Sequence, residues 1–194
     1  MALAATALAF ALVAGGCGSA SSAYFDVQDT WTRKELAHDG FDTEAYLYAT
    51  LKTMPFRRAY VDEYSRMFAL TGDQKTSLLE AEEAENEASY VVIAAFYTPE
   101  VGWNDLDPSR GIWEVRLEGP RGNVTRPHKV TRLNKRNPTW DALYPYTGLH
   151  YILYELRFAR TDDDGERVAN AGEPLKLVVS GAPARIELSW TLPR

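Results

Sequence analysis

The stretch YVVIAAFY, residues 90–97, constrains the fold more than any other part of the sequence. It is a continuous apolar run that is rich in β-branched and aromatic side chains. Such a run is typical of a strand covered on both faces, because a strand with one solvated face alternates apolar and polar residues. The sequence therefore predicts a doubly covered strand over residues 90–97.

Four later segments do alternate, as half-buried strands would. They are IWEVRLEG at 112–119, ILYELRF at 152–158, LKLVV at 175–179 and ARIELSWTL at 184–192. Weaker strands are expected at 124–133 and near 139–143. Six or seven short strands, separated by turns and not by helices, favour an antiparallel β-sandwich over 89–194, with an immunoglobulin-like arrangement as the leading candidate.

Residues 24–88 have a helical periodicity instead. Asp29 and Thr30 are suited to cap a short helix that ends near Leu36. A second helix is expected to start at Asp42, and Asp73 is expected to cap the last one. Apolar residues in this region form two stripes with helical spacing. The first stripe has the spacing i, i+4, i+7, and the second has the spacing i, i+1, i+4, i+7, i+8. The stripes consist of Leu47, Leu51 and Met54, and of Tyr60, Val61, Tyr64, Met67 and Phe68. The expected fold class is therefore α+β, with an N-terminal helical segment that packs on the sandwich.

The bulk composition is that of a folded protein, with 45% hydrophobic and 12% aromatic residues. The formal net charge of −6 gives no broad attraction to nucleic acid, which we do not expect as a partner. A single cysteine cannot form an internal disulfide or a zinc site made of cysteines.

That cysteine ends an uncharged apolar segment. Residues 2–14 are too few to span a bilayer, which takes about 20 residues, but fit the apolar region of a secretory signal. The sequence Ala14-Gly15-Gly16-Cys17 then resembles the signal of bacterial lipoproteins. The resemblance implies a diacylglycerol on Cys17, a signal peptide at 1–16, and a lipidated cysteine with a flexible tether at 17–23. It also implies membrane attachment by acyl chains, with the outer membrane favoured because Gly18 follows the cysteine, and a domain that faces the periplasm.

Two features depart from the lipoprotein pattern. No Lys or Arg precedes the apolar run, and Ala14 stands where these signals more often have Leu. Two other interpretations stay open: ordinary signal cleavage near residues 21–23, and a buried structural cysteine.

No catalytic motif occurs in the chain, and the three histidines are scattered. We therefore expect no enzyme activity and no cofactor. The loops at 103–113 and 162–166 carry several Asp residues, which suit turns and also suit calcium. The turn is the favoured interpretation of both loops. The glutamates of residues 80–87 are interpreted as a solvated helix face and not as a metal site.

One basic segment stands out from the acidic average. It contains Arg126, Lys129, Arg132, Lys135 and Arg136, with Trp140, Tyr144 and Tyr146 just beyond. Cations beside aromatic side chains are suited to bind an anionic group or a partner's acidic patch. The alternative is a strand with a charged outer face, followed by loop aromatics that enter the core.

Three segments are similar to those of uncharacterised bacterial envelope lipoproteins: FDTEAYLYATLKTMPFRRAY, FYTPEVGWNDLDPSRGIWEV and YPYTGLHYILYELRF. That similarity implies no activity and no catalytic residues. The leading hypothesis is a lipid-anchored envelope protein that binds an envelope protein partner as a structural or accessory subunit. A periplasmic module that binds a glycan or small ligand through Trp103 or Trp140 is the alternative. A hydrolase with a site assembled in space is a third.

Overall fold

The computed structural model describes residues 21–39, 42–134 and 137–194. The helices are α1 (Ser21–Trp31), α2 (Met54–Met67), α3 (Gly72–Ala88), the 3-10 turn η1 (Val101–Trp103) and α4 (Pro138–Leu143). No helix within the three described ranges is long and apolar enough to cross a membrane.

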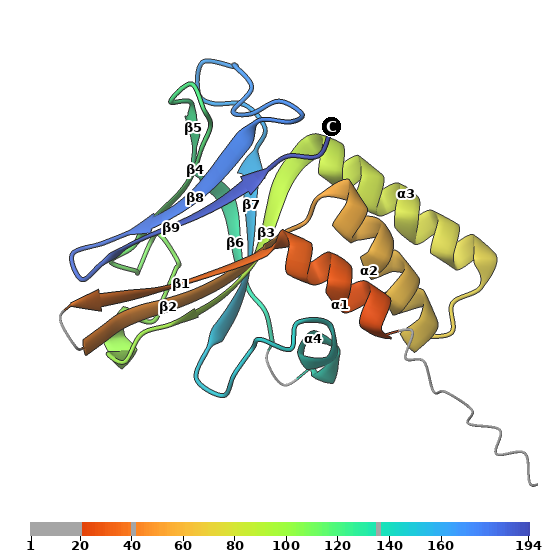
Figure 1. Cartoon of the computed structure of the whole chain (residues 1–194), viewed down its shortest axis with the longest axis horizontal. Coiled ribbons are helices and arrows are strands. Elements are labelled where there is room, and N and C mark those ends of the chain that lie inside the picture. The colour runs from red at the N-terminus through yellow and green to blue at the C-terminus, as the bar shows by residue number, and fades with distance from the viewer. Residues whose placement is uncertain (1–20, 40–41, 135–136) are drawn as a thin grey trace, which may run out of the picture.

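The strands form two antiparallel sheets. The first sheet has the order β1 (Thr32–Asp39), β2 (Asp42–Leu51), β3 (Ser89–Tyr97), β7 (Ile152–Ala159), β6 (Pro127–Arg132). The second has the order β5 (Val124–Thr125), β4 (Glu114–Glu118), β8 (Pro174–Ser180), β9 (Arg185–Thr191). Figure 1 shows them as two layers with the helices α1–α3 grouped at one end. The predicted α+β fold with an antiparallel sandwich is confirmed, whereas its immunoglobulin-like arrangement stays a prediction.

Strand β3 is covered on both faces, as its sequence predicts. Val92, Ala94 and Phe96 belong to the core between the two sheets. Ile93 and Ala95, which alternate with them, belong to a second core on the helix side of the first sheet. The buried members of this helix-side core are Tyr24, Phe56, Ile93, Ala95, Leu143, Tyr144 and Leu153.

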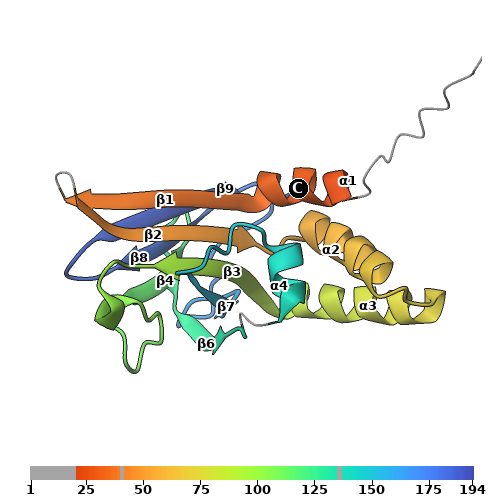
Figure 2. The ribbon, with the colours of Figure 1, turned by 90° about the horizontal axis from the view of Figure 1, so that it is seen from below.

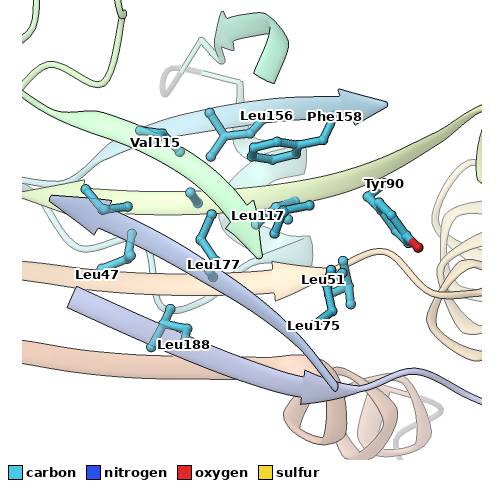
Figure 3. Packing of buried hydrophobic residues seen from close by; sticks show 14 of the residues in the cluster. Leu47, Leu51, Tyr90, Val115, Leu117, Leu156, Phe158, Leu175, Leu177 and Leu188 are labelled. Atoms are coloured by element: carbon cyan, nitrogen blue, oxygen red, sulfur yellow. The ribbon is translucent and has the colours of Figure 1, made fainter. Parts of the chain in front are cut away.

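The core between the sheets follows the predicted alternation in β4, β7, β8 and β9. Figure 3 shows pairs of side chains two positions apart on β4, β7 and β8, together with Leu188 of β9, pointing into the space between the layers. The predicted inward-facing residues that are buried there are Trp113, Val115, Leu117, Tyr154, Leu156, Phe158, Leu175, Leu177, Val179, Ile186, Leu188, Trp190 and Leu192.

Helices α1, α2 and α3 lie side by side, each antiparallel to the next along the chain (Figures 1 and 2). The predicted stripe of α2 is only partly a core stripe. Val61 is buried, while Phe68, just after the helix, is 47% exposed. The buried charged residues Arg57 and Glu63 of the same helix are not expected from the stripe.

The helical predictions for residues 32–36 and 42–51 are wrong, because these residues lie in β1 and β2. Leu47 and Leu51 are four positions apart, which is one helical turn but also an even number of residues. Both periods therefore place them on one face. Ala45 and Ala49 complete a period-two stripe, and all four side chains are buried. The region 24–88 is accordingly a mixed segment that supplies two strands of the first sheet.

Helix α1 begins at Ser21, so residues 21–23, which the sequence assigns to the tether, are helical. Tertiary contacts explain this, because a helix of 11 residues is marginal by itself. Tyr24 is 3% exposed, and its ring lies 5.9 Å from that of Phe56. Its hydroxyl donates to the carbonyl of Leu143 at 2.9 Å.

Two helix starts also differ from the predictions. Residues 139–143, expected to form a weak strand, lie in α4, where the Asn137 side chain accepts a hydrogen bond from the Thr139 amide at 3.0 Å. Asparagine in this position is a standard N-cap. The cap of α3 is Thr71, whereas Asp73 lies in the first helical turn.

Truncation of Phe96 tests the doubly covered strand. Phe96 is fully buried and packs edge-to-face on Trp113, with ring centroids 5.3 Å apart. We expect Phe96→Ala to lower the free energy of unfolding by about 3–5 kcal/mol, measured by urea denaturation. The control Val101→Ala removes a side chain that is 85% exposed and should change it by less than about 0.5 kcal/mol. Equal midpoints for the two variants would contradict the assigned core.

Candidate functional site

The predicted lipidation residue, Cys17, lies outside the described residues. Lys135 and Arg136 of the predicted basic segment lie outside them as well. Arg126, Lys129 and Arg132 are all exposed, on or next to β6, which is an edge strand of the first sheet.

The three described cations of this segment differ in their surroundings. Arg126 pairs with Glu114, with its Nη2 2.8 Å from Oε1. Lys129 and Arg132 pair in register with Arg157 and Tyr154 of β7. The aromatic side chains beyond them, Trp140, Tyr144 and Tyr146, pack in the helix-side core. The three aromatic side chains therefore enter the core, as the alternative interpretation of this segment expects. Lys129 and Arg132 remain exposed on the edge strand.

Turn chemistry describes both Asp-rich loops. The Asp107 carboxylate accepts from the Ser109 amide at 3.0 Å and from the Ser109 hydroxyl at 2.7 Å. The Asp162 carboxylate accepts from the amides of Asp164 and Glu166 at 3.1 and 2.9 Å. Gly165 has a φ of +82°, as expected for a glycine in a tight turn. Among the residues that the structure describes, no group of three or more His, Cys, Asp or Glu is arranged to hold a metal ion.

A pocket that the sequence did not predict lies where β2 ends and α2 begins. Its other walls come from the end of α3, the start of β3, the segment that joins β7 to β8 and the C-terminal residues that follow β9. Leu192 and Pro193 supply the C-terminal part of this wall, and Figures 1 and 2 show the C-terminus near the inner end of α2. Its volume is about 170 Å³, which is small compared with sites for drug-sized ligands. We call it the cationic pocket, because the polar side chains that line it are Lys52, Thr53, Asn86, Tyr90, Arg160 and Arg167.

The three cations of the pocket are unequally compensated. Lys52 is 8% exposed, and its Nζ lies 3.1 Å from Glu82 and 3.5 Å from Glu85. Within the described part of the chain, no carboxylate side chain lines the pocket. Arg160 and Arg167 form no ion pair with any described residue.

A buried ionic network stands behind Lys52. Arg57 is fully buried, and its Nη1 contacts Glu82 and also Glu85 at 2.7 Å. Glu85 in turn lies 2.5 Å from Arg157 of β7. The network therefore joins α2 and α3 to the first sheet and holds Lys52 at the edge of the pocket.

Arg160 is held in a defined orientation. Its guanidinium carbon lies 4.3 Å from the ring centroid of Tyr90. Its Nε donates to the Asn86 carbonyl at 2.6 Å, and its Nη2 donates to the Asn86 side chain at 3.2 Å. Burial lowers the pKa of Arg160, and the nearby positive charges of Arg167 and Arg57 lower this pKa further.

The tryptophans proposed for glycan contact have different environments. Trp140 packs in the helix-side core. Trp103 is 37% exposed and lines an open groove with Tyr46 and Tyr97, at the end of the first sheet near η1. The structure thus leaves Trp103 as the candidate of the two for contact with a sugar face.

The pH dependence of stability tests the network. Burial alone raises the pKa of Glu85, but the charges of Lys52, Arg57 and Arg157 outweigh this, and the pKa lies below its usual value. A depressed pKa stabilises the fold above the unfolded pKa of about 4.3, and this contribution is lost as the pH falls through the folded pKa. We expect Glu85→Gln to destabilise the protein at about pH 7 and to have little effect near about pH 3, measured by urea denaturation.

The matched control for this experiment is Glu87→Gln, since Glu87 is exposed on the same helix. Its effect should be small at both pH values. A destabilisation by Glu85→Gln that is the same at both pH values would contradict the ionic role of the carboxylate.

No protein-family model matches the sequence, and no curated protein matches it significantly. Among solved structures, the chain is similar to the crystal structure of a novel protein of unknown function from Burkholderia pseudomallei. The two share 12% identity with a TM-score of 0.45, and the match covers 88% of this chain and 83% of the other.

Proposed function

We propose that this chain is a lipid-anchored protein of the bacterial cell envelope and that its folded domain acts by binding rather than by catalysis. The observation that carries the proposal is the uncharged segment of residues 2–14 followed by Ala14-Gly15-Gly16-Cys17. A diacylglycerol together with an N-terminal acyl chain would hold the protein stably, because one chain alone anchors only marginally. The outer membrane, with the domain facing the periplasm, is the proposed location.

The start of α1 supports a domain that lies close to the membrane. Ser21 is the fourth residue after Cys17, and four extended residues reach at most about 14 Å. The outer end of the three-helix group, where α1 begins and α2 ends, would then be nearest to the lipid (Figure 1). The cationic pocket, at the inner end of α2, would be directed away from it.

Two kinds of binding are supported by different observations. Lys129 and Arg132 are exposed on the edge strand β6, which favours an accessory role with an acidic envelope protein partner. The cationic pocket favours the second candidate function, a small-ligand-binding module. The open groove at Trp103 gives that second candidate a place for a glycan, because Trp103, Tyr46 and Tyr97 combine an apolar ring with a polar edge.

Replacement of Cys17 tests the anchor. We expect the wild type to fractionate with membranes and its mature N-terminus to carry lipid on Cys17, since the cysteine thiol is the attachment atom. Cys17→Ser should lack the lipid and leave the membrane fraction. The measurement is membrane fractionation combined with the intact mass of the mature chain. A mature wild-type chain that begins near Tyr24 without lipid would contradict the proposal.

Charge reversal tests the partner surface. Replacing Arg132, Lys135 and Arg136 by Glu should abolish in-cell crosslinking to an envelope partner, because like charges repel across the interface. The matched control reverses three exposed cations elsewhere, Arg58, Lys75 and Arg110. An unchanged crosslinking pattern in the first variant would remove this surface from the proposal.

A further inference from the structure

The cationic pocket has more positive than negative charge, and this excess indicates what kind of ligand would bind there. The whole chain has a net charge of −6, yet two of the three cations at this pocket have no carboxylate partner in the described chain. Lys52 is different, since Glu82 and Glu85 neutralise it. The uncompensated charge is therefore on Arg160 and Arg167.

Arg160 has donors to spare. A guanidinium carries five N–H groups, and the two hydrogen bonds of Arg160 to Asn86 occupy one on Nε and one on Nη2. Burying a charge without a partner is costly unless something neutralises it. Stacking on Tyr90 and bonding to Asn86 fix the orientation of the guanidinium but do not cancel its charge.

Thr53 is a buried polar side chain without a partner in the described chain, at the wall of the pocket. Its side chain lines the pocket, is 4% exposed, and has a hydroxyl with no hydrogen-bond partner among the described residues. Thr53 is also the N-cap of α2, but its hydroxyl does not cap the helix. A threonine in this position ordinarily satisfies a helix amide, whereas here its oxygen is closed off from solvent and unpaired within the described part of the chain.

The remaining wall of the pocket is apolar. Leu51 and Met54 line it on the side of β2 and α2, and Leu192 lines it on the side of the C-terminus. The pocket thus combines guanidinium groups with an aliphatic surface, in a volume of about 170 Å³.

We propose that the cationic pocket binds a small organic anion, whose oxyanion group contacts Arg160 and Arg167 and whose apolar part packs on Leu51 and Leu192. Guanidinium groups match the geometry of carboxylates and phosphates, and such charge-assisted hydrogen bonds are about twice as strong as neutral ones. The inference deepens the small-ligand candidate function and rests on it. It does not depend on the anchor at Cys17.

Isothermal titration calorimetry on the full chain in a nonionic detergent tests the proposal. The probes are hexanoate, butyl phosphate and inorganic phosphate, with 1-hexanol as the neutral control. We expect at least one of the two organic anions to bind more tightly than inorganic phosphate, and hexanol not to bind. Tighter binding of hexanoate than of butyl phosphate identifies a carboxylate ligand, and the reverse order of affinities identifies a phosphate ester. No binding of either organic anion at about 10 mM would overturn the proposal.

Variants locate the site. Arg167→Gln alters an exposed side chain and should weaken binding of the tighter anion by about tenfold, the effect of one charged hydrogen bond. Arg160→Gln should weaken it at least as much, and its unfolding midpoint reports whether the fold survives. Arg110→Gln, which removes an exposed cation on the loop after η1, should leave binding unchanged. Equal affinities for all three variants would overturn the assignment.

The outcomes separate the two proposals. Anion binding by a Cys17→Ser chain that leaves the membrane would support the pocket, and loss of binding in an anchored Arg167→Gln chain would leave the anchor intact. An anchored wild type that binds none of the anions would refute the pocket alone.

Discussion

Burial of β3 on both faces is the constraint on which the rest of the structure depends. A strand with Val92, Ala94 and Phe96 on one face and Ile93 and Ala95 on the other needs an apolar layer on each side. The second sheet supplies one layer, and α1, α2 and α4 supply the other. The helices therefore do not form a unit of their own. The chain between α1 and α2 enters the first sheet as β1 and β2, so that helices and sheet share one core.

Fastening the helices to the sheet requires more than apolar contact. The fully buried Arg57 of α2 is neutralised by Glu82 and Glu85 of α3, and Glu85 continues to Arg157 of β7. Removing one partner from such a group leaves a buried charge, which costs about 3–5 kcal/mol. Because the buried guanidinium of Arg57 needs both carboxylates, the ionic network fixes how α2 and α3 pack on the sheet. It also fixes Lys52, where the chain turns from β2 into α2.

How far the sequence predicts this fold depends on the contrast between its two periods. Strands such as β9 alternate clearly, and β3 has no polar residue to interrupt it, so both are predicted correctly. In β2 the apolar residues are spaced by even numbers, and Leu47 and Leu51 satisfy the helical period equally well. The sequence of helix α1 carries no strong helical signal. Contacts of Tyr24 with residues far away in the chain stabilise the helix instead. Tertiary context decides in both places.

The cationic pocket is a product of the topology and so has no local signal. Lys52 is far from Arg160 and Arg167 in the chain. The two arginines flank an acidic turn, so the sequence around them has no net positive charge. They meet because β3 pairs with both β2 and β7, which brings the end of β2 next to the end of β7. The carboxylates of α3 reach Lys52 but form no ion pair with Arg160. The same helix that neutralises the buried network therefore leaves the guanidinium of Arg160 without a carboxylate partner in the described chain, and the proposed anion site rests on this difference.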